Sequence, residues 1–227
     1  MSTLEAPTAS KSERAYEWLR ERIARQEYPP GHRLVLAPIA EALAMSAVPV
    51  REAIRRLEAE GLVTFERNVG ARVTLVDESA YVHAMQALGV VEGAATALSA
   101  PHLGASDLAR AARVNDRMRT LLTDLDPHAF TQLNRRFHSV LFEACPNPDL
   151  LEAVHRGWSR LSGIRDSTFA FVPGRASHSV DEHDELLELL REGADPLRIE
   201  LAARDHRWRT MDAFLAARHP DAIGRTA

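Results

Sequence analysis

Apolar residues near the start of the chain recur at helical spacing in three short stretches, and two β-like runs follow them. The stretches are residues 14–26, Leu36–Leu43 and a segment after Ser46 with Val50, Ala53, Ile54 and Leu57 on one face; the runs are Leu62–Arg67 and Ala71–Val76. Two prolines and a glycine at 29–31 cannot continue the first helix, and Gly61 ends the third. This order predicts a winged helix-turn-helix domain over residues 11–76, with a small two-stranded β wing.

From Asp77 onward the pattern is helical throughout, and no strand-like alternation follows Val76. The predicted helices cover residues 79–100, 106–123, 127–144, a long segment capped by Asn147, 177–191 and 196–218. Short turns between successive helices favour an antiparallel all-helical bundle of six or seven helices over residues 77–220. The expected fold class is therefore mainly α, in two domains.

The third helix carries the strongest local signals. The Ser46 hydroxyl can cap its start, and Pro49 is tolerated because the first turn has no intrahelical partner for its N–H. Arg51, Arg55 and Arg56 lie off the apolar stripe. Taken alone, they fit a solvated face as well as a DNA-reading face.

Composition limits the classes of function. The 227 residues hold 28 basic and 32 acidic side chains, so the chain is no basic nucleic-acid-binding protein overall. Residues 1–76 hold 11 basic and 10 acidic side chains, against 17 and 22 in the remainder, which suggests site-specific rather than non-specific DNA contact.

The single cysteine, Cys145, excludes an intramolecular disulfide and is consistent with a reducing cytosol. We expect a cytoplasmic protein without membrane contact and a disordered tail over residues 1–10, because no apolar run approaches 18 residues and the tail lacks a signal core.

Three histidines of the second domain stand on apolar helix faces. Asn134 and His138 are four residues apart and so share a face, while His183 and His206 lie on two later helices. If the helices converge, three imidazoles and an amide could hold a divalent metal with an open position, and imidazole suits Zn, Ni, Cu or Fe. Hydrogen-bonded core histidines are the alternative.

The segment Tyr16–Val76 resembles the winged-helix domain of the GntR family of transcription regulators. The matching elements are Tyr28-Pro29-Pro30-Gly31, Ile39-Ala40-Glu41-Ala42-Leu43, Pro49-Val50-Arg51-Glu52-Ala53 and Glu60-Gly61-Leu62-Val63. The resemblance implies a recognition helix in the major groove and a wing on the minor groove or backbone. The residues expected at the DNA are Ser46, Val48, Pro49, Arg51, Arg55, Asn68, Gly70 and Arg72.

This winged-helix domain departs from the family pattern at two places. Leu36-Ala37 stands where members commonly carry an acidic–basic pair, and Ala47 where they carry a base-contacting arginine. Arg51 is retained at the second arginine position. Because each lost Arg–guanine contact removes about 1–3 kcal/mol of discrimination, we expect an operator unlike the usual one or more reliance on phosphates.

The second domain resembles the FadR-type C-terminal domain, called FCD, so that the two resemblances together cover roughly residues 14–215. The similarity lies in Leu133–His138, Glu182-His183, the His206 helix and Val91-Glu92-Gly93-Ala94-Ala95. It implies that an Asp and three His hold a divalent metal, with Zn or Ni expected here, and that a small organic acid binds beside it. Asn134 replaces the Asp, which predicts weaker metal retention and a stronger pull on an anionic effector. The expected metal residues are Asn134, His138, His183 and His206.

The effector itself is not specified by the sequence. Leu88 stands where the family often has an arginine for the effector carboxylate. Arg135, Arg165 and Arg175 are possible substitutes, but each fits a solvated arginine better. Trp158 and Phe169 fit either a pocket wall or the core.

We therefore expect a ligand-responsive transcription regulator, a repressor acting as a homodimer on a double-stranded pseudo-palindromic operator and released by a small carboxylate. One alternative is a metal-dependent enzyme that uses the three histidines. Its candidate bases, Asp181, Glu182, Asp184 and Glu185, fit solvated acids near a helix start better. The other alternative is a DNA-bound dimer scaffold without an effector.

Overall fold

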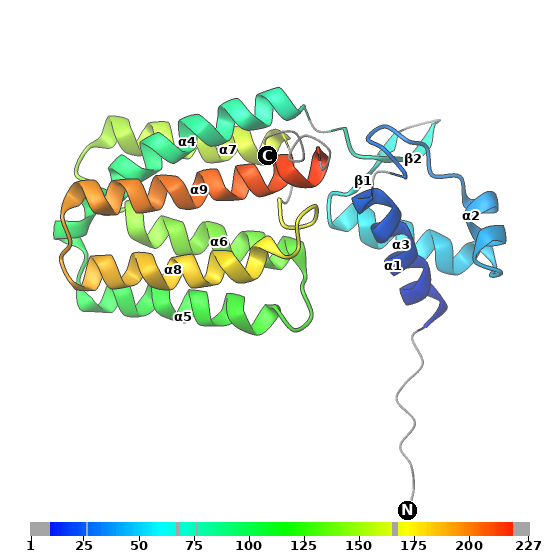
Figure 1. The fold of residues 1–227 in the computed structure, drawn as a ribbon, viewed down its shortest axis with the longest axis horizontal. Coiled ribbons are helices and arrows are strands. Elements are labelled where there is room, and N and C mark those ends of the chain that lie inside the picture. Colours follow the sequence, from blue (N-terminus) through cyan, green and yellow to red (C-terminus); the bar gives the residue numbers. More distant parts are fainter. Residues whose placement is uncertain (1–9, 26, 67–68, 76, 165–167, 220–227) are drawn as a thin grey trace, which may run out of the picture. The chain divides into compact units, whose positions relative to one another are not determined.

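The computed structural model describes residues 10–25, 27–66, 69–75, 77–164 and 168–219, and residues 1–9 of the expected tail lie outside this part. The chain forms two compact units, Met1–Leu75 and Val76–Ala227. Figure 1 shows helices in both units, and among the described residues the strands β1 and β2 lie in the first unit, in agreement with the expected mainly α fold.

The first unit is a winged helix-turn-helix. Its elements are α1 Lys11–Ala24, α2 Leu36–Ala42, α3 Ala47–Ala59, β1 Val63–Glu66 and β2 Gly70–Val73. The strands pair antiparallel, with Val63 opposite Val73 and Glu66 opposite Gly70. The predicted wing is confirmed, although its strands are shorter than the β-like runs.

Two predictions about residues at helix starts need correction. Ser10, placed in the disordered tail, instead caps α1, because its hydroxyl accepts a hydrogen bond from the Glu13 N–H at 3.0 Å. Ser46 does sit at the N-cap of α3, but within the described residues its side chain makes no capping hydrogen bond. The stripe of α3 holds as predicted, since Val50, Ala53, Ile54 and Leu57 are all buried.

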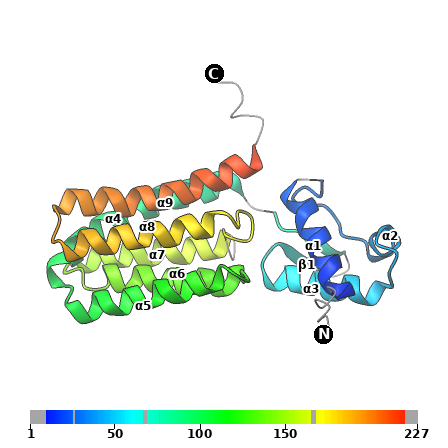
Figure 2. The same ribbon diagram turned by 60° about the horizontal axis from the view of Figure 1, so that its bottom comes forward.

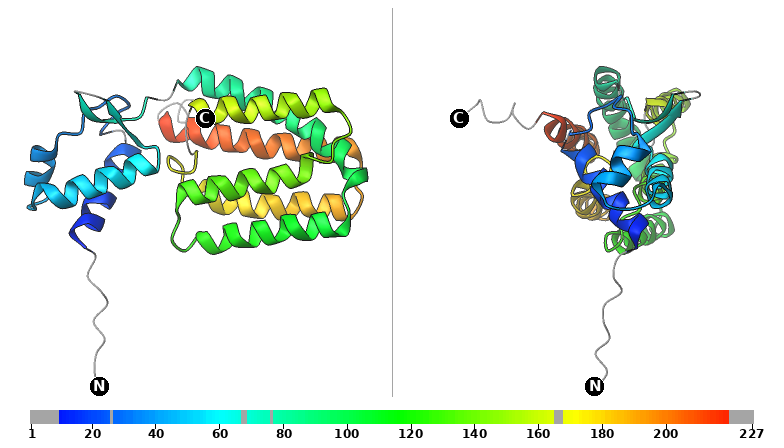
Figure 3. Two further views of the ribbon diagram at one scale, coloured as in Figure 1. Left: turned by 180° about the vertical axis from the view of Figure 1, so that it is seen from behind. Right: turned by 90° about the vertical axis from the view of Figure 1, so that its right-hand side faces the viewer.

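The second unit is the predicted antiparallel bundle. Among the described residues it contains α4 Glu78–Ser99, α5 Ala105–Leu121, α6 Pro127–Phe142, α7 Pro148–Ile164, α8 Arg175–Arg191 and α9 Pro196–Arg218, with a short 3-10 turn at Ala100–His102. Helix α4 packs on α7 and α9, and α8 packs on both α5 and α9. Figures 2 and 3 show these helices from other sides.

Local chemistry explains where these helices begin. The side chains of Asp77, Asp126, Asn147 and Asp195 each accept hydrogen bonds from backbone N–H groups of the following turn. Pro127, Pro148 and Pro196 occupy the first helical position, where a missing N–H costs nothing. The starts of α4, α6, α7 and α9 are therefore fixed by sequence signals that act over three residues.

The close approach of α4 and α9 positions the site described below. A Cβ on Gly93 of α4 would lie 2.7 Å from the backbone oxygen of Glu200 on α9, so only glycine fits this contact. Glu92 and Arg207 consequently meet across the two helices. Within the described residues, no helix is both long enough and apolar enough to cross a membrane.

Candidate functional site

The predicted convergence of three histidines is confirmed. His138 of α6, His183 of α8 and His206 of α9 are all buried, and one ring nitrogen of each lies within 4.8 Å of those of the other two. The ring centroids form a nearly regular triangle: His138 is 5.0 Å from both His183 and His206, which are 4.8 Å apart. Three imidazoles that the sequence separates by up to 68 residues thus form one cluster.

Each imidazole is oriented by a partner at Nδ1. The His138 Nδ1–H donates to Glu92 Oε1 at 2.9 Å, and the His206 Nδ1–H donates to Glu182 Oε2 at 2.6 Å. The His183 Nδ1–H donates to Asn115 Oδ1 at 2.9 Å, while the His183 ring stacks on Phe137 at 3.8 Å. These bonds select the tautomer that leaves Nε2 as the unprotonated nitrogen, as outer partners do in metal sites.

None of these three partners was predicted from the sequence to orient a histidine. Glu92 lay in a recognised signature without an assigned role, and Asn115 interrupts the otherwise apolar face of α5 formed by Ala111, Val114 and Met118. The interpretation of Glu182 as a solvated acid is wrong, because its carboxylate is held by His206 and Arg175. Glu182 is therefore already engaged, which weakens its candidacy as a general base in an enzyme.

Burial keeps the cluster neutral. Burial lowers the pKa of His138 to about 3 and the pKa of His206 to about 4, and the charge of Arg207 adds to both effects. Burial also lowers the pKa of His183 well below its usual value. Burial alone would raise the pKa of Glu92, but Arg207 and His138, through charge and hydrogen bonds together, outweigh this effect and lower the pKa to about 2. At neutral pH the site therefore offers uncharged imidazoles beside an ionised carboxylate.

Several buried polar atoms at the cluster have no hydrogen-bond partner among the described residues. They include His138 Nε2, His183 Nε2 and the Oδ1 atom of Asn134, whose side chain lies on the same face of α6 as His138. Buried polar groups are almost always paired, and each exception needs a cause. Imidazole nitrogen and amide oxygen are both donors that a divalent cation accepts. The predicted metal residues thus fit a metal ion.

Two buried arginines flank the cluster. Arg207 holds Glu92 through three hydrogen bonds of 2.8–3.1 Å, and its guanidinium lies over the Trp158 ring at 4.1 Å. Arg175 is 5% exposed and contacts Glu182 and the His206 carbonyl, yet its Nε and Nη1 have no partner within the described part of the chain. The expectation that Arg175 is solvated is therefore wrong, because the α8–α9 contact buries it. Arg135 is exposed as expected, and Arg165 lies outside the described residues.

A cavity of about 40 Å³ adjoins Asn134. Trp158 and Phe169, for which the sequence left pocket wall and core both open, line it together with Arg207 and belong to the core as well. Four hydroxyl side chains complete its polar lining: Thr131, Ser162, Thr168 and Thr210. Leu88 is fully buried among Phe142, Val154 and Trp158, so the position of the usual family arginine is here a packing position.

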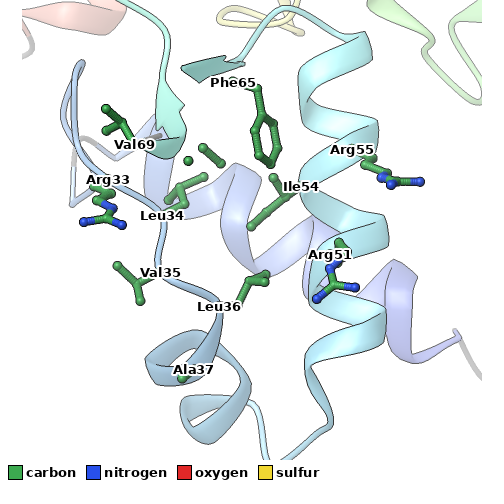
Figure 4. A pocket seen from close by; sticks show the side chains of 12 residues that line it. Arg33, Leu34, Val35, Leu36, Ala37, Arg51, Ile54, Arg55, Phe65 and Val69 are labelled. Atoms are coloured by element: carbon green, nitrogen blue, oxygen red, sulfur yellow. The ribbon is translucent and has the colours of Figure 1, made fainter. Parts of the chain in front are cut away.

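The first unit presents an exposed face around α3. Ser46, Arg51 and Arg55 are exposed, and Val48 is 60% exposed. A groove of about 590 Å³ runs beside Arg51 and Arg55, between α3, the start of α2 and the wing. Figure 4 shows Leu36 and Phe65 lining this groove, so the departure at Leu36-Ala37 lies next to the arginines.

The other expected DNA residues differ in their placement. Pro49 and Gly70 are half-buried, and Asn68 lies outside the described residues. Arg72 is tied down, because its guanidinium donates to the Gly31 carbonyl at 2.8 Å and pairs with Glu66 at 3.2 Å. The geometry of Arg72 supports a role in holding the wing. Arg56 lies over the Tyr16 ring at 3.7 Å and pairs with Glu13, so it belongs to the α1–α3 contact.

Comparison with known proteins covers both units. Residues 11–73 match the family described as bacterial regulatory proteins, gntR family, and residues 83–208 match the FCD domain. HTH-type transcriptional regulator McbR of Escherichia coli K12 is 24% identical over 174 residues, which cover 76% of this chain and 79% of McbR. The "Probable D-xylose utilization operon transcriptional repressor" of Paenarthrobacter nicotinovorans is 29% identical, over 81% of this chain and 80% of the relative. The solved structure of E. coli McbR/YncC shares the fold at a TM-score of 0.52 and 20% identity, over 95% of this chain and all of that one.

Proposed function

The chain belongs to the gntR family of bacterial regulatory proteins with an FCD domain, and on this premise we propose that it is a metal-dependent, acid-responsive repressor. It is a DNA-binding transcription regulator whose DNA-binding domain is the first unit. We assign binding of the effector to the second unit. The observation that carries the proposal is the cluster of three buried histidines, together with a cavity lined by Asn134, which lies one helical turn from His138. Two relatives have the word repressor in their names: the probable D-xylose utilization operon transcriptional repressor and HTH-type transcriptional repressor GlaR. These names support repression as the function proposed here. A regulator of this kind acts in the cytoplasm, where its operator lies.

The metal is assigned to four side chains. His138, His183 and His206 would hold it through Nε2, and Asn134 through Oδ1, with Zn or Ni as the expected ion. When bound, such an ion attracts the carboxylate of an organic acid. The chain's own contribution is to keep the imidazoles neutral and oriented, through Glu92, Asn115 and Glu182.

Operator reading is assigned to the exposed face of α3. Arg51 and Arg55 are exposed one helical turn apart, which suits them to guanine edges and phosphates of the major groove. Val48 adds an apolar surface for a thymine methyl group. Since one near-neutral reader contacts few bases, a homodimer on a two-fold site is needed for specificity.

The effector acts only if it binds one arrangement of the protein better than the other. A gel shift of the purified, metal-loaded protein on its operator, with a panel of small carboxylates, tests this. We expect at least one acid to weaken operator binding. If every acid leaves the binding isotherm unchanged, the chain is a DNA-bound scaffold rather than an acid-responsive repressor.

We assign the homodimer contact to α4. Val90 and Leu98 are each 46% exposed on this helix, and Ala87 is exposed on it as well. The neighbouring surface of α7 carries the ion pair Glu152–Arg156. In a two-fold dimer the apolar side chains of α4 would pack on those of the second copy, and the acidic and basic side chains of α7 would pair across the interface.

Val90→Glu is expected to shift the protein toward monomer, because it places a charge on the apolar contact surface. Sedimentation velocity of wild type and variant measures the shift. Glu188→Gln, on an exposed residue of α8, serves as the control and should sediment like wild type. A Val90→Glu protein that remains dimeric would place the interface elsewhere.

Glu182→Gln is expected to weaken Ni²⁺ binding by about 10–100-fold, the usual effect of removing an outer partner of a histidine ligand. The reason is that the Glu182 carboxylate orients His206 and accepts its Nδ1–H. Equilibrium dialysis gives the affinity. Glu188→Gln, two turns further along the same helix, should bind Ni²⁺ as wild type does. Equal affinities for all three proteins would show that Glu182 does not support a ligand.

A further inference from the structure

We propose that metal and a small carboxylate bind this site cooperatively, each tightly only when the other is present, because Asn134 offers an uncharged amide and the carboxylates around the histidines are already paired with arginines. The inference rests on the proposed metal site and deepens it, by naming the ligand class and its coupling to the metal.

The buried charges around the histidines are already balanced before any cation arrives. Glu92 is paired with Arg207, and Glu182 is paired with Arg175. The half-exposed side chain of Arg209 also contacts Glu182. A divalent cation held by neutral imidazoles and the Asn134 amide therefore adds two buried positive charges without a protein counter-charge. Burying an unpaired charge costs free energy, so an anion bound next to the metal would stabilise it.

The cavity beside Asn134 can receive that anion. Its wall includes Arg207 and Trp158, and the Trp158 Nε1–H is buried without an acceptor among the described residues. The Trp158 side chain is 4% exposed, so bulk water does not replace the missing acceptor. A carboxylate oxygen is the acceptor that such an N–H and a neighbouring guanidinium both suit.

The size of the cavity limits the acid. At about 10–15 Å³ for each water molecule, 40 Å³ holds about three waters, which corresponds to roughly 90 Å³ of liquid. A carboxylate of about two to four carbons fills this space. The hydroxyl groups of Ser162, Thr168 and Thr210 in the wall favour an acid that also carries a hydroxyl.

Cooperativity follows from charge and is reciprocal. If the acid raises the affinity for the metal by a given factor, the metal raises the affinity for the acid by the same factor. Asn134→Asp places a negative charge of the protein at the site, so it should strengthen metal binding in the absence of acid and reduce this factor, because the acid then has less charge to compensate.

Isothermal titration of the full-length protein with Ni²⁺, with and without saturating acetate, tests the inference without DNA. Acetate is the bare carboxylate, and neutral acetamide of the same shape is the control. We expect acetate to tighten Ni²⁺ binding by about tenfold in wild type, and acetamide to have no effect. In Asn134→Asp the affinity without acetate should rise, and the acetate effect should fall below about twofold.

Each contrary result has a distinct meaning. Tight Ni²⁺ binding by wild type that acetate does not change overturns the cooperativity but leaves the metal-dependent repressor standing. The same conclusion follows if acetamide acts as acetate does. Absence of Ni²⁺ binding in wild type and Asn134→Asp, with and without acetate, overturns both the cooperativity and the proposed metal site. The wild-type comparison stands even if the variant fails to fold.

Discussion

Arg51→Ala is expected to weaken operator binding by about 2–6 kcal/mol for a dimer on two half-sites. Each bidentate arginine–guanine contact contributes about 1–3 kcal/mol of discrimination, and the dimer makes two. Arg51 is exposed on α3, in contrast to Arg56, whose guanidinium is held against Tyr16 and Glu13. The binding isotherm of a gel shift at a stated salt concentration measures the loss.

Two further variants separate base reading from charge. Arg51→Lys keeps the charge but lacks the planar fork, so it should lose most of the specificity while retaining non-specific affinity. Arg136→Ala removes an exposed arginine from the other unit and should bind the operator as wild type does. If Arg51→Lys discriminates operator from random DNA as well as wild type, Arg51 contacts phosphate rather than a base.

His183→Ala is expected to abolish metal binding and the stability that the metal confers. At a metal concentration of 100 times Kd, binding stabilises the folded state by about 2.7 kcal/mol, a rise in Tm of roughly 5–10 °C. His183 is fully buried, and its ring stacks on Phe137, so alanine removes both a ligand and packing. The comparison that matters is therefore the Tm of each protein with Ni²⁺ against its own Tm with chelator.

His155→Ala provides the matched control for this experiment. His155 is about half-exposed on α7 and pairs with Glu143 at 3.5 Å, away from the cluster. Its Ni²⁺-dependent rise in Tm should equal that of wild type, while His183→Ala should show none. A rise of the same size in all three proteins would place the metal elsewhere.

The helices, and the candidacy of each histidine, were predictable because their signals are local. Helix α9 has the bounds that the pattern predicted, since Asp195 caps it and Pro196 opens it. The three histidines could be proposed because each shows as a polar residue on an otherwise apolar helix face. The family resemblance then indicated that these faces meet.

What the sequence did not reveal depends on contacts between distant segments. Asn115 is 68 residues from His183, and Glu92 is 115 residues from Arg207, so no spacing rule connects them. Arg175 was taken for a solvated arginine because its burial arises only where α8 meets α9. In the first unit, Arg72 matched a wing position, but its bond to the Gly31 carbonyl depends on a turn 41 residues earlier.

Genomic fragment selection by the purified protein, followed by footprinting, shows whether the protein reads a specific operator through α3. We expect the retained fragments to share one two-fold-symmetric sequence of which the protein protects both halves, and we expect Arg51→Ala to fail to enrich it. Retained fragments without a common sequence, or enrichment that is unchanged in Arg51→Ala, would contradict a repressor that reads its operator through α3.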